Sequence, residues 1–130
     1  MTWYVASCIM AIIQEEGHNG PIPVFENFFL ISATSRAEAK KRAIQIGISE
    51  AAVDDGTTLD GRPAKTLFMG VRKIRSIYGQ SKGMDELPPI DGDELSHSFY
   101  HVPDLETVRS LAEGKVVTIT YVDDDESIDS

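Results

Sequence analysis

The stretch that decides the fold is Trp3 to Ile13, WYVASCIMAII, which contains no charged residue. Apolar side chains occupy both alternating sets of positions, which is typical of a strand that is covered on both faces or lies at an oligomer interface. The stretch is long for one strand, so we expect a bend or bulge near Ser7. It is too short to span a bilayer and lacks the basic start and cleavage site of a signal peptide, so we expect neither feature.

Four further segments have the composition of strands. β-branched and aromatic residues are concentrated in them, between stretches that are rich in Gly, Pro, Asn and Asp. The expected strands are residues 24–33, 65–78, 94–102 and 115–122, with loops at 14–23, 54–63 and 79–93. Simple alternation along the strand at 65–78 places Arg72 opposite Lys73 and Arg75, which divides these basic residues between two faces.

Two helices are expected between these strands. Ser35, with Glu38 three residues later, forms a capping box that predicts a helix start. Gly47 is a natural end for that helix, unless a short helical turn resumes through residues 49–53. Asp104 caps a second helix, which Gly114 is predicted to stop. The predicted apolar positions are Ala39, Ala43 and Ile46 in the first helix and Leu105, Val108, Leu111 and Ala112 in the second.

The order ββαββαβ predicts an α+β fold, with a mostly antiparallel sheet and both helices on one face, resembling a ferredoxin-like sandwich. We expect residues 1–122 to form a single α+β domain and residues 123–130 to form an acidic flexible tail. The second face of the sheet would carry Trp3, Ile9 and Ile13. Because a large apolar face is rarely left in water, we expect a homodimer through the sheet.

Three short motifs resemble a family of small bacterial proteins, the domain-of-unknown-function family 4288. They are Trp3-Tyr4-x-Ala6, Ala33-x-Ser35-x-x-Glu38-Ala39 and Phe68-x-Gly70-Val71. The resemblance covers about residues 3–80. It implies the strand, the capped helix and the glycine-containing strand already expected here, and it implies no catalytic residue.

Composition limits the class of protein. Of the 130 residues, 42% are hydrophobic and 25% are charged, which is close to the average of globular domains. The net charge of −9 argues against a nucleic-acid or membrane binder. Cys8 is the only cysteine, so neither an internal disulfide nor a cysteine-based zinc site is possible. We expect a cytoplasmic protein.

The acidic residues are concentrated near the end of the chain. Residues 83–130 contain two basic and thirteen acidic residues, whereas residues 36–82 contain ten basic and five acidic ones. One acidic group lies in a loop stiffened by Pro88 and Pro89. Its members are Asp85, Glu86, Asp91, Asp93 and Glu94. This loop is either a solvated connection or a surface that binds a basic partner.

No catalytic, metal or cofactor site emerges from the sequence. In a strand, His97 and His101 would lie about 13 Å apart, too far to share a metal ion. Cys8, in the most apolar strand, has the character of a small buried hydrophobe. A pocket that binds a small molecule remains an alternative. Its candidate residues are Arg72, His97, Tyr100 and His101.

Two functions therefore stay open. The first is a non-enzymatic acidic interaction protein of bacterial or phage type, such as an immunity protein or an inhibitor. It would neutralise a basic nuclease or nucleic-acid-binding protein by occupying the surface that binds a polyanion. The alternative is a ligand-binding or enzymatic ferredoxin-like dimer that acts on a small molecule, because the fold class alone decides neither.

Overall fold

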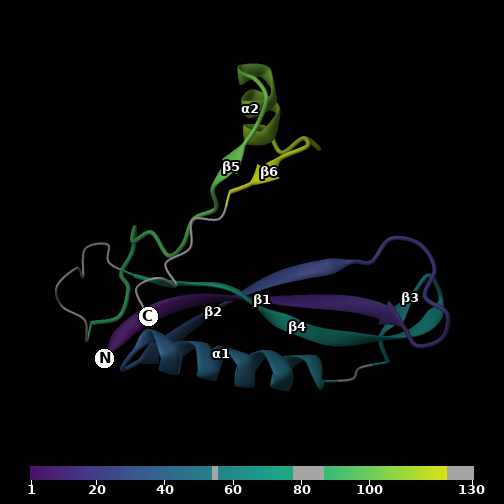
Figure 1. Cartoon of the computed structure of the whole chain (residues 1–130), viewed down its shortest axis with the longest axis horizontal. Helices are drawn as coiled ribbons and strands as arrows, with labels where there is room; N and C mark the ends of the chain where they lie inside the picture. Colours follow the sequence, from purple (N-terminus) through teal and green to yellow (C-terminus); the bar gives the residue numbers. More distant parts are fainter. Residues whose placement is uncertain (54–55, 78–86, 123–130) are drawn as a thin grey trace.

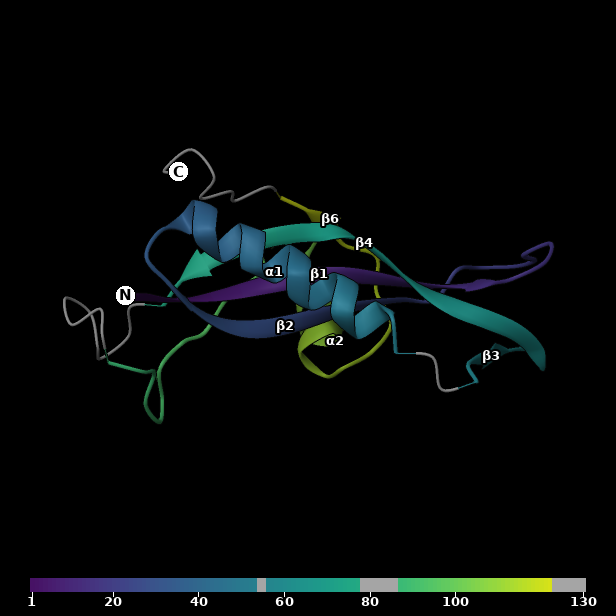
Figure 2. The same ribbon diagram turned by 90° about the horizontal axis from the view of Figure 1, so that it is seen from below.

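A computed structural model of the chain describes residues 1–53, 56–77 and 87–122. It has an α+β fold with a mostly antiparallel sheet and two helices, as the sequence predicts at that level. The sheet has the strand order β2-β1-β4-β3, and helix α1 lies across one face of it (Figures 1 and 2). The elements are β1 (Thr2–Gln14), β2 (Val24–Ala33), α1 (Arg36–Ala51), β3 (Thr58–Leu59), β4 (Arg62–Ser76), β5 (Tyr100–His101), α2 (Leu105–Ala112) and β6 (Thr120–Tyr121).

Strand β1 is the centre of the sheet because both of its edges are paired. It runs antiparallel to β2 on one side and to β4 on the other. One set of alternating side chains points toward α1 and forms the core with residues of β2, β4 and α1. The core residues of β1 are Tyr4, Ala6, Cys8 and Met10. The sequence predicts a strand that is apolar on both faces, and α1 is the element that covers one of these faces.

Helix α1 begins as predicted and ends later than predicted. The Ser35 hydroxyl accepts a hydrogen bond from the Glu38 N–H at 3.1 Å, which confirms the cap. Ala39 and Ala43 are fully buried against the sheet. Gly47 does not end the helix, because the helix continues to Ala51. Gly47 is buried instead, where the ring of Phe68 packs against the space that a side chain would need.

Two bulges in β4 change which residues share a face. The register with β1 shifts between Ser7 and Cys8 and again between Ile9 and Met10, leaving Arg72 and Met69 as extra residues of β4. The irregularity expected near Ser7 is therefore present, with the extra residue on the neighbouring strand. Alternation was expected to place Arg72 and Lys73 on opposite faces of the sheet, and the bulge makes this prediction wrong. The Lys73 side chain reaches His97 and the Arg72 side chain reaches Tyr121, both in residues 87–122.

We call the sheet face opposite α1 the outer face. The register places Trp3, Ile9 and Ile13 there, as expected. Basic residues of β4 share that face, because Arg75, Lys73 and Lys65 pair with Val5, Ser7 and Ile13 of β1.

Strand β3 lies in a segment for which the sequence analysis expects only a loop. Leu59 and Arg62 pair across a two-residue turn in which Asp60 and Gly61 both have positive φ, 53° and 77°. This is the conformation that Asp-Gly favours in tight hairpins. The Asp60-Gly61 pair was therefore an available signal that the sequence analysis missed.

Residues 87–122, which we call the arm, depart most from prediction. Only Tyr100–His101 and Thr120–Tyr121 form strands, where 94–102 and 115–122 were expected, and they pair with each other rather than with the main sheet. Helix α2 lies away from the sheet rather than beside α1 (Figure 1). The expectation of two helices on one face is wrong for α2, and the order of a ferredoxin-like sandwich is not confirmed.

Within the described ranges, none of the helices is long and apolar enough to cross a membrane.

Candidate functional site

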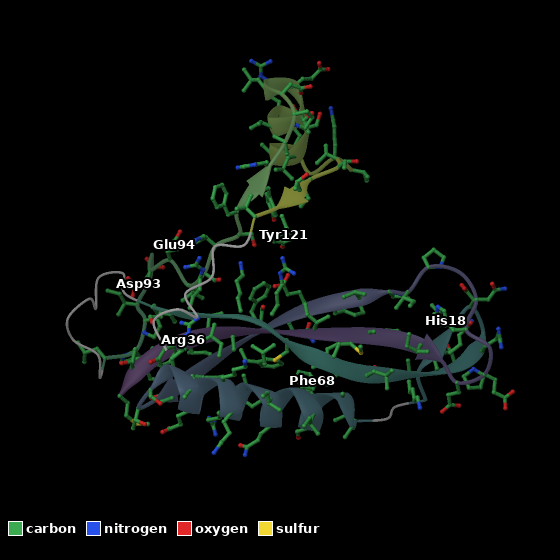
Figure 3. The ribbon with its side chains drawn as sticks, viewed as in Figure 1. His18, Arg36, Phe68, Asp93, Glu94 and Tyr121 are labelled. Carbon is green, nitrogen blue, oxygen red and sulfur yellow. The ribbon has the colours of Figure 1, made fainter. Side chains whose placement is uncertain are left out.

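The acidic loop contains a defined turn at the foot of the arm. The Asp93 N–H donates to the Ile90 carbonyl at 3.0 Å, and the Ile90 N–H donates to the Asp93 carboxylate at 2.9 Å. Gly92 has a φ of +91°, which suits the third position of a type II turn. We call residues 90–94 the acidic turn. Figure 3 shows Asp93 and Glu94 beside each other at its end.

The turn separates the predicted acidic residues by role. Asp93 is half-buried and its carboxylate stabilises the turn, whereas Asp91 and Glu94 are exposed. Asp85 and Glu86 were predicted for the same surface and lie outside the described residues. The arm as a whole carries six acidic and two basic residues. The exposed carboxylates therefore lie on a segment with an excess of negative charge.

The arm contacts β4 at His97 and Tyr121, which we call the root of the arm. Two neighbouring basic residues of β4 hold the root. The Arg72 guanidinium stacks over the ring of Tyr121, 4.0 Å from its centre, and Tyr121 in turn packs edge-on against Tyr100. The Lys73 ammonium donates to the carbonyl of His97 and lies close to the Ser98 hydroxyl. The bulge in β4 positions Arg72 and Lys73, because it allows the side chains of these adjacent residues to reach the arm together.

The four residues of the alternative ligand pocket have different neighbours, and only His101 of the four lines the concavity described below. Arg72 and Tyr100 meet around Tyr121, as described above, whereas His101 packs edge-on against Phe99 with ring centres 5.5 Å apart. His101 lines an open concavity of about 560 Å³ between β5, α2 and the segment before β6. Arg72, His97 and Tyr100 do not line that concavity.

Helix α2 is capped but poorly covered. The Asp104 carboxylate accepts hydrogen bonds from the Thr107 N–H and hydroxyl, both at 2.8 Å, and these bonds hold the pKa of Asp104 below its usual value. No residue of the helix is buried. Leu105, Val108 and Ala112, at positions i, i+3 and i+7, form an exposed apolar row that we call the α2 stripe.

The outer face also exposes apolar side chains, mainly along β2. Val24, Phe28 and Leu30 are 57%, 54% and 51% exposed, and their register with β1 places them opposite α1. Within the described part of the chain, no strand pairs with the free edge of β2. Ser7 Oγ and Glu26 Oε2 are buried on this face without a hydrogen-bond partner.

The far end of the sheet holds a polar network that the sequence analysis missed. Gln14 is buried; its side-chain amide donates to the Leu59 carbonyl at 3.0 Å, and its side-chain oxygen accepts from the Asn19 N–H at 2.9 Å. His18 accepts from the Gln14 N–H at 3.0 Å through Nδ1, which gives its imidazole a structural role at this end of the sheet. Figure 3 shows His18 far from the acidic turn.

No three His, Cys, Asp or Glu side chains of the described ranges gather as they would around a metal ion. Cys8 is fully buried in the core, and burial raises the pKa of its thiol. A thiol with a raised pKa holds little thiolate at neutral pH, so Cys8 is poorly suited to act as a nucleophile.

The fold thus defines a small α+β protein with a helix-covered sheet and a projecting arm. The family model of a domain of unknown function (DUF4288) matches residues 3–88, so the chain belongs to that family. The match confirms the resemblance inferred from the three motifs, and it spans the main sheet and α1 and ends at the start of the arm. No curated protein and no solved structure matches the chain.

Proposed function

We propose that this protein is a non-enzymatic interaction protein whose acidic turn binds a basic protein partner. The observation that carries the proposal is the built turn at residues 90–94, which presents Asp91 and Glu94 to solvent while Asp93 holds the backbone. A partner of the nuclease or nucleic-acid-binding class fits this surface, because such proteins carry a basic patch for a polyanion. The protein would then act as an immunity protein or inhibitor by covering that patch.

The physical basis is charge complementarity with a preformed segment. Opposite charges across an interface accelerate diffusional encounter, and the acceleration falls as salt screens the charges. A turn that is already hydrogen-bonded loses less conformational freedom on binding than a flexible loop does. The excess of acidic residues along the arm extends the same field around Asp91 and Glu94.

The test is a charge reversal with a matched control. Asp91→Lys with Glu94→Lys reverses two exposed charges in the acidic turn. Glu15→Lys with Glu16→Lys reverses two exposed charges at the opposite end of the sheet, near His18. Each variant is used as bait in extracts of the source cell, beside the unchanged protein.

We expect the unchanged protein and the Glu15/Glu16 variant to retain the same basic protein, and the Asp91/Glu94 variant to lose it. Equal retention by all three would rule out the acidic turn as the recognition surface. Loss with the Glu15/Glu16 variant alone would transfer recognition to the far end of the sheet. Circular dichroism of each variant shows whether the fold is intact.

The alternative, a ligand-binding or enzymatic ferredoxin-like dimer, has less support. The concavity beside His101 is its favourable feature, and that concavity is open to solvent. Arg72, His97 and Tyr100 do not line it, which weighs against this alternative.

A further inference from the structure

Two apolar surfaces are left exposed in the part of the chain that the structure describes, one on α2 and one on the sheet. One is the α2 stripe, in which Leu105 is 61% and Val108 is 44% exposed. The other is the outer face along β2, where Phe28 and Leu30 are each more than half exposed. Figure 1 shows α2 projecting away from the sheet, on the side opposite α1.

The arm needs a surface to pack on. An eight-residue helix is marginal in water by itself, and so is an isolated two-stranded ribbon. In this chain α2 has no buried residue, and β5 and β6 contribute two residues each. Burial of the α2 stripe against an apolar surface would supply the stabilisation that the arm lacks.

The root contacts keep the arm off its own β2. Arg72 and Lys73 tie Tyr121 and His97 to β4, which lies on the other side of β1 from β2. The arm thus carries α2 outward, away from its own outer face (Figure 1), on the β2 side of the molecule (Figure 2). Phe28 and Leu30 of β2 are left exposed and open to the arm of another molecule.

The charges of the two surfaces are complementary. Lys65 and Arg75 lie on the outer face along β4, together with Lys73, which already contacts His97 of its own arm. Glu106 is exposed within α2, whereas Glu113, directly after it, is paired with Lys115 at 2.9 Å. The arm as a whole has four more acidic than basic residues, so an α2 that packs on the outer face of another copy brings net negative charge toward a basic strand, which favours association.

We propose that the outer face is the docking surface for the arm of a second copy of this chain, in a two-fold dimer with exchanged arms. A two-fold arrangement forms the contact between stripe and outer face twice, so each uncovered surface acquires a cover. Stable interfaces bury about 800 Å² per partner. The duplicated contact includes Phe28, Leu30, Leu105 and Val108 from each copy, with the flanking charges at its rim.

The first test is the oligomeric state by sedimentation velocity across a range of concentrations. We expect a dimer for the unchanged chain, and a self-association Kd raised about tenfold or more for Val108→Asp and for Phe28→Ser. The matched control is Ile48→Asp, at an equally exposed apolar position of α1, which leaves the dimer intact. A monomer at all concentrations, or a dimer that only Ile48→Asp weakens, would overturn the proposal.

The second test asks which surfaces meet. Chains carrying Phe28→Cys and chains carrying Val108→Cys, with tags of different mass, are mixed and oxidised; buried Cys8 stays unreactive. We expect a disulfide between the two kinds of chain, identified by peptide mass spectrometry. Val108→Cys mixed with Ser49→Cys, on exposed α1, should give none.

A chain that carries both Phe28→Cys and Val108→Cys distinguishes exchange from closure. A disulfide within one chain of a monomer would mean that the arm folds over its own outer face, and this would refute the exchanged dimer. The dimer proposal and the proposed function are tested separately, because Val108→Asp changes the α2 stripe and leaves Asp91 and Glu94 in place.

Discussion

Replacement of Gly47 by alanine tests the packing of α1 on the sheet. A Cβ at this position would lie 2.5 Å from Cδ1 and 3.1 Å from Cζ of Phe68, so the ring has to move. Alanine stabilises a helix interior by about 1 kcal/mol relative to glycine. Overpacking of a core costs about 1–3 kcal/mol. The second effect is larger at this contact, and we expect Gly47→Ala to lower the free energy of unfolding by about 1 kcal/mol.

The sign should reverse when the ring is removed. In a Phe68→Ala background the obstructing side-chain atoms are absent, so Gly47→Ala should raise the free energy of unfolding by about 0.5–1 kcal/mol through helix propensity alone. Urea unfolding of the four chains of this double-mutant cycle measures the coupling, which we expect at about 1.5–2 kcal/mol. A Gly47→Ala effect of the same sign and size in both backgrounds would refute the proposed contact.

Three further predictions concern other parts of the molecule. Gln14→Ala should cost about 1–2 kcal/mol in urea unfolding, because a buried side chain loses its hydrogen bonds to the Leu59 carbonyl and the Asn19 N–H, and an unchanged midpoint would contradict this. The hydrogen bonds to Asp104 lower the pKa of its carboxyl group in the folded protein. Asp104 therefore stabilises α2 fully above the pKa that this carboxyl has in the unfolded chain, and the stabilisation is lost as pH falls through the lowered pKa. The Thr107 amide resonance should follow this titration and should stay constant in Asp104→Asn. Arg72→Ala should speed hydrogen exchange of the β5–β6 amides and leave the β1 amides unchanged, because only the root of the arm loses a contact of about 0.5–1 kcal/mol.

Local signals predicted the main sheet and α1 well. The uncharged stretch in β1, the β-branched residues of β2 and the Ser35 cap are signals of neighbouring residues, and each produced the expected element. Gly47 led to a wrong prediction of the helix end, because a glycine can allow close packing as well as end a helix. The sequence predicted an irregularity near Ser7 but not that the extra residue would be Arg72 of β4, because that depends on the register between β1 and β4.

The arm shows where composition alone fails. Residues 115–122 are rich in valine and threonine, which favours strands, but a strand also needs a partner edge. Only Thr120 and Tyr121 have one, in β5. Among the acidic residues, the sequence predicted the cluster but not that Asp93 would be used inside the turn, since that role depends on a hydrogen bond across three residues.

The most direct test of the central claim is the association rate of the retained basic partner at low and high salt. The Debye length falls from about 10 Å at 0.1 M to about 3 Å at 1 M, so recognition through Asp91 and Glu94 should weaken across this range. We predict a rate constant at 0.1 M that is about tenfold or more lower for Asp91→Lys with Glu94→Lys than for the unchanged protein, and rates that converge at 1 M. Equal rate constants for the two chains at 0.1 M would contradict the account.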